Sequence, residues 1–255
     1  MSLLHLITEL FAAQPDWYDE KMRSESDHQP TLEELNEFDL YLEFSDLAYL
    51  ESEIALIKKL RVMDYLLIRH DVATEPGRVG HFIAVNHDKK EVVIAIKGTS
   101  SFSDILTDLV GNAIPHTLDG EKKETVRCHE GIHTAAAMML DDTQHLIETF
   151  FLPAGYEIVI CGHSLGAGVS CLLGVFLRSR GIPVRVIAFA TPACLSWEAA
   201  TSCQDYITTV VNNKDCIPRV SLRSLASLMK LFIKIDENLK ERGMSPSGWM
   251  SQEHT

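Results

Sequence analysis

The chain has 255 residues, of which 46% are hydrophobic and 23% are charged. This composition is ordinary for a globular protein and argues against intrinsic disorder, collagen and coiled coil. Lysine and arginine together number 23 and aspartate and glutamate 36, so the net charge is −13. An acidic chain repels the phosphate backbone of nucleic acids, so we expect no nucleic-acid partner.

The sequence carries no signal for membrane insertion or export. No apolar run approaches the roughly 18–20 residues that span a bilayer. The N-terminus lacks a basic segment and soon reaches Glu9 and Asp16, so no signal peptide is predicted. Six cysteines are too few for a disulfide scaffold in a chain of this length. We therefore expect a cytoplasmic protein, peripheral to membranes at most.

The first 60 residues have the apolar spacing of helices. Thr31 and Glu34, three residues apart, predict a capping box at the start of a second helical segment, which continues to about residue 60. We expect residues 1–60 to form a helical N-terminal cap.

Short apolar runs rich in β-branched residues follow from residue 65 and predict strands at 66–68, 82–85, 92–96, 158–161, 184–189 and 207–211. Residues 87–90 predict a hairpin loop, and helical stretches are expected at 133–151, 165–180 and 221–241. Strands that alternate with helices indicate an α/β fold, a mostly parallel sheet with helices on both faces. With no convincing linker, residues 1–255 are expected to form a single domain.

A catalytic motif lies between the strand at 158–161 and the following helix. Residues 162–166 read Gly-His-Ser-Leu-Gly, the G-x-S-x-G pattern, which places Ser164 at a tight strand-to-helix turn. Glycines two residues before and after the serine remove side chains that would collide where strand and helix cross. The helix N-terminus brings a positive partial charge and free N–H groups to a developing oxyanion. The pattern predicts that Ser164 is a nucleophile.

Several further blocks accompany this motif in a fixed order, at residues 94–100, 103–109, 129–131, 188–192 and 210–219. With them, the chain from about residue 40 to 240 resembles the class 3 (fungal-type) lipase family of α/β-hydrolases, most of all its diacylglycerol-lipase-type members. The resemblance implies an α/β-hydrolase-type fold and a serine ester hydrolase that cleaves diacylglycerol or monoacylglycerol. It implies no cofactor.

The oxyanion hole of such an enzyme needs two donors. The backbone N–H of Leu165, the residue after the nucleophile, is one by geometry. Gly98-Thr99 matches the oxyanion motif of the family, so the resemblance implies Thr99 as the second donor. The family usually has arginine where Lys97 stands. The stretch 102–110 matches its lid, and 111–127 is expected to be a mobile surface loop.

The predicted acid is Asp215, which follows the last strand and matches the acid motif of the family. In a parallel sheet it lies at the same edge as the elbow, and the chain order of the fold is serine, acid, histidine. A loop aspartate that caps the next turn is the structural alternative. Asp205 and Asp236 are the nearest other acids. Among eleven histidines only His254 follows Asp215, so chain order selects it as the base, although it is the penultimate residue.

Two further features of the sequence bear on its function. Residues 129–133 satisfy H-E-x-x-H, a zinc motif when it lies on a helix. Gly131 is a poor helix former, and the same residues match a lipase block, so we expect no metal and a structural, hydrogen-bonded His129. Residues 222–242 are apolar with five basic and three acidic side chains. They either pack on the sheet or contact a membrane surface.

The leading hypothesis is a Ser-His-Asp ester hydrolase acting on acylglycerols, with lipid as its partner and a transient membrane contact. The alternative is a catalytically impaired, lipase-like scaffold that binds a lipid or a protein. A correctly placed base separates the two. The sequence specifies no oligomeric state.

Overall fold

A computed structural model describes residues 30–72, 77–99, 112–118, 125–213, 215–220 and 222–241. The chain divides into two compact units, Met1–Glu37 and Phe38–Thr255. Of the first unit the described part is 30–37, where helix α2 (Leu32–Leu47) begins. The Glu34 N–H donates to Thr31 Oγ1 at 3.2 Å and the Thr31 N–H to the Glu34 carboxylate at 2.8 Å, which confirms the capping box. The single domain and the 1–60 cap stay predictions.

The second unit is built on a six-stranded sheet in the order β1-β2-β3-β6-β7-β8. Pairs β1–β2 and β2–β3 are antiparallel and the other three pairs are parallel, so only β2 runs against the rest. This confirms the predicted mostly parallel sheet. The strands are β1 (Leu66–Asp71), β2 (His81–Asn86), β3 (Glu91–Ile96), β6 (Glu157–His163), β7 (Arg185–Phe189) and β8 (Ile207–Val210). Residues 87–90 form the predicted hairpin turn.

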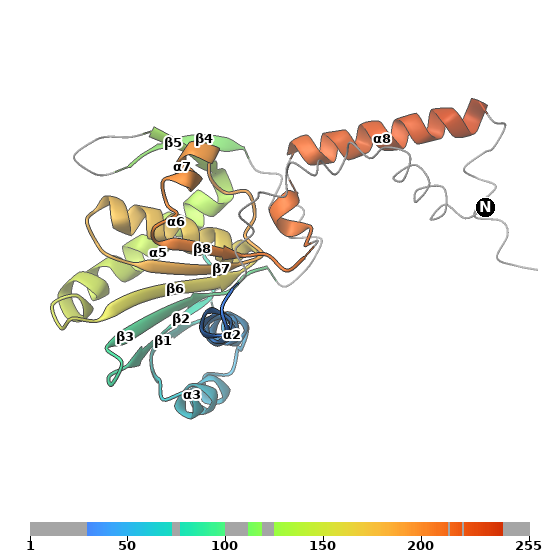
Figure 1. The fold of residues 1–255 in the computed structure, drawn as a ribbon. Coiled ribbons are helices and arrows are strands. Elements are labelled where there is room, and N and C mark those ends of the chain that lie inside the picture. The colour runs from blue at the N-terminus through green and yellow to red at the C-terminus, as the bar shows by residue number, and fades with distance from the viewer. Residues whose placement is uncertain are drawn as a thin grey trace, which may run out of the picture. The chain divides into compact units, whose positions relative to one another are not determined.

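One face of the sheet is covered by α2 and by α3 (Glu53–Val62), whose N-cap is Ser52 (Figure 1). Phe44 of α2 and Leu56 and Leu60 of α3 are fully buried against alternate strand residues. Each such side chain contributes about 1.5–3 kcal/mol by burial. The predicted helical segment is therefore two helices, separated where Ser52 accepts a hydrogen bond from the Ala55 N–H.

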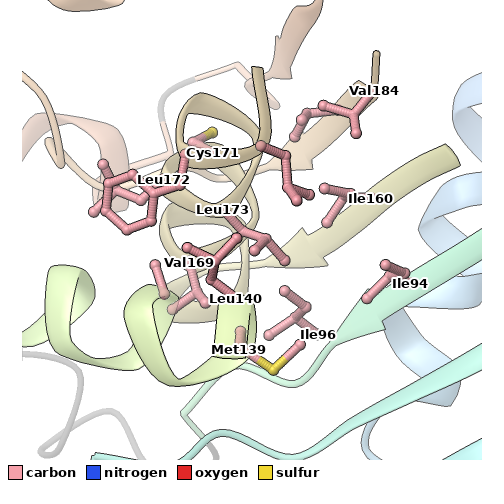
Figure 2. Close-up of a cluster of buried hydrophobic side chains, with 14 of the residues drawn as sticks. Ile94, Ile96, Met139, Leu140, Ile160, Val169, Cys171, Leu172, Leu173 and Val184 are labelled. Atoms are coloured by element: carbon pink, nitrogen blue, oxygen red, sulfur yellow. The ribbon is translucent and has the colours of Figure 1, made fainter. Parts of the chain in front are cut away.

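The opposite face is covered by α5 (Glu130–Leu146), which ends in a π-helical turn (Ile147–Phe151), and by α6 (Leu165–Ser179). Figure 2 shows how the two helices interlock with the sheet: Met139 and Leu140 of α5 and Val169, Leu172 and Leu173 of α6 meet Ile94, Ile96 and Ile160. The residues of β3 alternate between the two faces, with Val93 and Ala95 toward α2 and α3. The sequence predicted both helices, and both are confirmed.

The prediction of a surface loop over 111–127 was wrong for the described part of that segment. Ala113–Thr117 and Thr125–His129 form an antiparallel ribbon, β4–β5. Its cross-strand pair Ile114 and Cys128 packs on the cluster between α5 and α6. Burial of this apolar pair outweighs the preference of Pro115 for a turn. A two-stranded ribbon tolerates a proline because both of its strands are edge strands.

The remaining elements are short, except the last. They are α7 (Trp197–Thr201), a 3₁₀ turn at Ile217–Arg219 and α8 (Leu222–Glu241), the predicted C-terminal helix. No helix in the part of the chain that the structure describes is long and apolar enough to cross a membrane.

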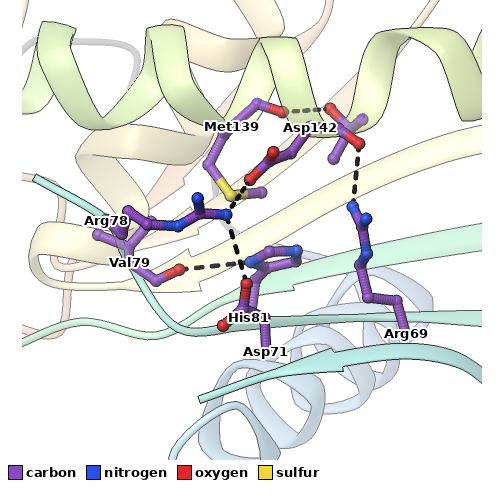
Figure 3. A network of polar contacts seen from close by, with 8 residues as sticks. Arg69, Asp71, Arg78, Val79, His81, Met139 and Asp142 are labelled. Carbon is purple, nitrogen blue, oxygen red and sulfur yellow. Dashed lines mark hydrogen bonds and ion pairs between the residues drawn. The ribbon is translucent and has the colours of Figure 1, made fainter. Parts of the chain in front are cut away.

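A polar network ties β1 to α5 (Figure 3). The Arg78 guanidinium lies 2.6 Å from the Asp142 carboxylate and 3.6 Å from that of Asp71, and Arg69 donates to the Asp142 backbone carbonyl at 2.9 Å. These side chains are about one-third exposed, so the ion pairs contribute at most about 1 kcal/mol each. Beneath them lies the buried His81, whose Nδ1 faces the Val79 carbonyl at 3.3 Å.

We expect His81 to make the fold acid-sensitive. Burial lowers the pKa of His81, although the Val79 carbonyl, Asp71 and Asp142 oppose this effect. The unfolded chain therefore takes up a proton more readily than the folded one, and stability that is present above about pH 6.5 is lost as the pH falls below it. Urea unfolding measured between pH 7.5 and 5 should show this loss. It should be smaller in His81→Phe, and an unchanged pH dependence would contradict the assignment.

Candidate active site

The turn between β6 and α6 has the geometry of a nucleophile elbow. Ser164 adopts φ 57° and ψ −123°, a backbone conformation that residues with a side chain rarely occupy and that costs about 1–3 kcal/mol. Its N–H donates to the Phe189 carbonyl at 3.0 Å, which ties the elbow to the neighbouring strand β7. The strand, the strained turn and the helix that G-x-S-x-G predicted are all present.

The two motif glycines are required by the close approach of three backbone segments. A Cβ on Gly162 would lie 2.6 Å from the Gly166 carbonyl group, and a Cβ on Gly166 would lie 2.2 Å from the Ile96 carbonyl oxygen. No side chain fits at such distances. The close approach of β6 and α6 at Gly162 agrees with the predicted collision, and the start of α6 also packs directly on the end of β3.

The Ser164 side chain is almost completely buried, with 1% of its surface exposed. Within the residues that the structure describes, its Oγ has no hydrogen-bond partner. A buried hydroxyl without a partner normally costs free energy, so its persistence points to a chemical role. The hydroxyl lies at the N-terminus of α6, where free N–H groups and the helix dipole favour negative charge.

The loop after β3 lies against the elbow. Ile96 pairs with Gly162 in the β3–β6 ladder, so the chain that leaves β3 runs beside the turn. A Cβ on Gly98 would come within 2.4 Å of the His163 carbonyl oxygen and 3.5 Å of the Gly166 nitrogen. The half-buried Thr99 follows directly. The structure thus brings the loop of Thr99 and the helix start of Leu165 together, as an oxyanion hole requires.

Sequence reasoning missed Tyr49, which follows α2 and braces this loop. The same Cβ on Gly98 would lie 2.4 Å from the Tyr49 hydroxyl oxygen. Burial raises the pKa of Tyr49, and a hydrogen bond from the Gly98 N–H opposes that rise. The Lys97 ammonium lies 6.0 Å from the centre of the Tyr49 ring. No local pattern marks Tyr49, because its contact with Gly98 arises only when α2 packs across the sheet.

Asp215 follows β8, two strands from β6 at the same edge of the sheet. Its Oδ1 accepts a hydrogen bond from the Ile217 N–H at 3.0 Å, and its N–H donates to the Asn212 carbonyl at 3.1 Å. Arg219 donates to the Asp215 backbone carbonyl and, at 3.2 Å, to that of Asn213. One carboxylate oxygen therefore caps the 3₁₀ turn, which holds the side chain in place. The structural alternative, an aspartate that caps the next turn, is therefore present, and it uses one of the two carboxylate oxygens of Asp215.

The other two acids lie in different settings. Asp205 precedes β8 and pairs with Arg178 at 3.1 Å, near the C-terminal end of α6. Ser164 lies at the N-terminal end of that 15-residue helix, roughly 20 Å away at 1.5 Å per residue. Asp236 lies inside α8. Geometry therefore removes Asp205 from the candidates.

The predicted base His254 lies outside the described residues, whereas His129 and His133 lie within them. His129 is the N-cap of α5, and its Nδ1 accepts from the Ile132 N–H at 3.4 Å. His133 lies one turn into the helix, and its Nε2 contacts His116 Nδ1 at 2.9 Å. Because His129 precedes the helix and caps it, the H-E-x-x-H motif does not lie wholly within the helix, and His129 is hydrogen-bonded as the sequence predicted.

All six cysteines are free thiols. Five are buried, including Cys171 on α6 and Cys161 on β6, which the sequence predicted to be small buried hydrophobic residues. Burial raises the pKa of Cys161 to about 12, so its thiol stays protonated and unreactive.

A mostly parallel sheet, helices on both faces and a strained serine turn after a central strand define the α/β-hydrolase fold. Residues 93–225 match the family model lipase (class 3). The chain belongs to that family.

Similar proteins agree with this assignment. The mouse diacylglycerol lipase-beta is 32% identical over 184 residues, which cover 70% of this chain and 27% of the relative. The human diacylglycerol lipase-alpha is 33% identical over 163 residues, covering 60% and 16%. This chain thus spans about a quarter or less of those relatives. A solved triacylglycerol lipase with a serine protease triad has a TM-score of 0.65 at 17% identity and 78% coverage of both chains, which shows the shared fold.

Proposed function

We propose that the protein is a serine ester hydrolase that cleaves acylglycerol esters, either diacylglycerol or monoacylglycerol. The observation that carries this proposal is the elbow itself: a buried Ser164 hydroxyl, held by a left-handed backbone at a helix N-terminus beside the loop of Thr99. Membership in the lipase family and the likeness to diacylglycerol lipases support the substrate class.

In this mechanism Ser164 Oγ attacks the ester carbonyl carbon while His254 accepts its proton. The backbone N–H groups of Leu165 and Thr99 donate to the oxyanion of the tetrahedral intermediate. His254 then returns the proton to the departing alcohol, which leaves an acyl-serine that water hydrolyses. Asp215 orients the imidazole and stabilises its cation. No step requires a cofactor or a metal.

The substrate class is tested with purified full-length protein. Emulsions of diacylglycerol and monoacylglycerol are incubated with the enzyme, and released fatty acid is measured. A peptide library serves as the competing substrate. We expect fatty acid release, unaffected by phenanthroline, and no peptide cleavage. Cleavage of peptides without release of fatty acid would overturn the proposal.

We expect Asp215→Asn to lower kcat by about 10⁴ with KM little changed, because an amide cannot stabilise the imidazolium. The side-chain oxygen of asparagine can still accept from the Ile217 N–H, so the 3₁₀ turn and the fold survive. Asp205→Asn is the matched control, at the far end of α6. Equal turnover in the two variants would assign the acid to another residue.

The setting of the reaction follows from its substrate. Acylglycerols reside in lipid phases, so we propose a transient contact between the protein and a membrane surface. We also propose a cytoplasmic location, which the six free thiols support because oxidising compartments favour disulfides. A single catalytic domain over the whole chain, with residues 1–60 as its cap, completes the proposal.

A further inference from the structure

Helix α8 exposes an apolar stripe to solvent. Met229, Phe232 and Ile233 have 61%, 49% and 56% of their surface exposed. Residues spaced by three and four positions lie on one face of a helix, so these three side chains form a continuous patch over one turn. Exposed apolar residues scattered singly are normal, whereas a clustered group on one helical face usually marks a contact surface.

A second apolar stripe of the same helix is covered. Ile235 is buried, with 7% of its surface exposed, and Leu231, four positions earlier, is partly buried. Neither of the two hydrophobic clusters found among the described residues contains a residue of α8. The stripe formed by Met229, Phe232 and Ile233 therefore does not serve the core beneath the sheet.

The helix is positively charged up to the end of the exposed stripe. Lys230 and Lys234 are exposed beside it, and no acidic residue lies between positions 222 and 235. Asp236, four positions after Phe232 and on the same face, and Glu237 follow the stripe. The whole helix has four basic and three acidic residues, 4 − 3 = +1, in a chain of −13. A lysine beside an apolar face can bury its carbon stem and hold its ammonium at the level of lipid headgroups.

We propose that the first two-thirds of α8 lies in the surface of an anionic lipid membrane, with Met229, Phe232 and Ile233 among the acyl chains and Lys230 and Lys234 at the headgroups. This inference rests on the proposed function, since it names the surface that brings the substrate to the enzyme. A second copy of the chain is the alternative occupant, and the test below distinguishes it from a lipid surface.

The position of α8 in the chain suits this role. The helix begins seven residues after Asp215, at the carboxyl edge of the sheet where the elbow lies (Figure 1). A short segment of chain therefore links a lipid surface held by α8 to the end of β8, which Asp215 follows. In the sequence, the helix also connects Asp215 to His254.

The test uses full-length protein and flotation with two kinds of vesicle, pure phosphatidylcholine and phosphatidylcholine with phosphatidylserine. The variant Met229→Gln/Phe232→Gln/Ile233→Gln keeps a good helix former at each position. We expect it to weaken binding to the anionic vesicles by at least about 100-fold. The matched control is Ile54→Gln/Val62→Gln, which changes two even more exposed apolar residues on α3 and should leave binding unchanged.

The charge contribution is tested separately. Lys230→Gln/Lys234→Gln should weaken binding to anionic vesicles by about 30-fold and leave binding to neutral vesicles unchanged. The control Lys58→Gln/Lys59→Gln removes two exposed lysines from α3 and should have little effect.

Hydrolysis of a short, water-soluble ester separates this inference from the proposed function. All α8 variants should keep that activity while they lose hydrolysis of vesicle-borne diacylglycerol. Unchanged vesicle binding in the triple variant would overturn the membrane assignment even if the enzyme is active. Dimerisation of the natural chain that the triple variant abolishes would assign the stripe to a second copy instead. If the natural chain does not hydrolyse the water-soluble ester, the proposed function is refuted, and the result on vesicle binding still stands.

Discussion

Ser164→Ala is expected to abolish ester hydrolysis, with a loss of roughly 10⁶ in kcat, as for the removal of the serine from a comparable triad. The Ser164 hydroxyl makes no hydrogen bond within the described structure, so alanine removes a nucleophile without removing a structural contact. The free energy of unfolding should therefore stay within about 1 kcal/mol of that of the natural protein. Release of fatty acid from diacylglycerol and urea unfolding measure the two quantities.

The matched control for this variant is Ser179→Ala, at the other end of α6. Its hydroxyl donates to the Phe176 carbonyl at 2.8 Å and lies far from the elbow. We expect normal turnover from it. Substantial hydrolysis by Ser164→Ala would show that a different nucleophile serves, and the elbow would then be only a tight connection between β6 and α6.

His254→Ala is expected to have the second large effect, again about 10⁶ in turnover, because a serine hydroxyl without a base is a weak nucleophile. Deletion of residues 254 and 255 should give the same loss. The fold should be unaffected, since the two core clusters are made of residues far upstream. Steady-state hydrolysis of a soluble ester, with circular dichroism as the check on folding, measures the effect.

His145→Ala, at the exposed end of α5, is the control for a histidine outside the mechanism. Two other outcomes are decisive. If the natural chain and the deletion variant are both inactive, the protein is the lipase-like scaffold of the alternative hypothesis. If both are fully active, an earlier histidine is the base and the chain-order argument is wrong.

The elements that the sequence predicted well are those with local signals. The capping box of Thr31 and Glu34, the hairpin at 87–90 and the close approach of Gly162 to Gly166 all act through residues within a few positions of one another. Steric exclusion at Gly162 follows from the motif, because the start of the next helix lies against the end of the strand, whereas Gly166 is excluded by Ile96 of the distant strand β3. Local chemistry of this kind is independent of the rest of the fold.

The elements that the sequence missed depend on contacts between distant segments. The β4–β5 ribbon forms because Ile114 and Cys128 bury against α5 and α6, despite a proline and loop-like flanks. Tyr49 meets Gly98 only after α2 has packed on the sheet. The turn cap made by Asp215, by contrast, was the structural alternative in the sequence, and the structure shows its hydrogen bond from the Ile217 N–H. Its role as the acid, with those of Thr99, Leu165 and His254, stays a proposal that mutagenesis tests.

The most direct test of the central claim is labelling of the full-length protein with a fluorophosphonate, followed by mass spectrometry of the labelled peptide. The probe reacts only with an activated serine and needs no knowledge of the substrate. We expect stoichiometric labelling at Ser164, lost in Ser164→Ala and in His254→Ala and retained in Ser179→Ala. Absence of labelling in the natural protein, or a label on any other serine, would contradict it.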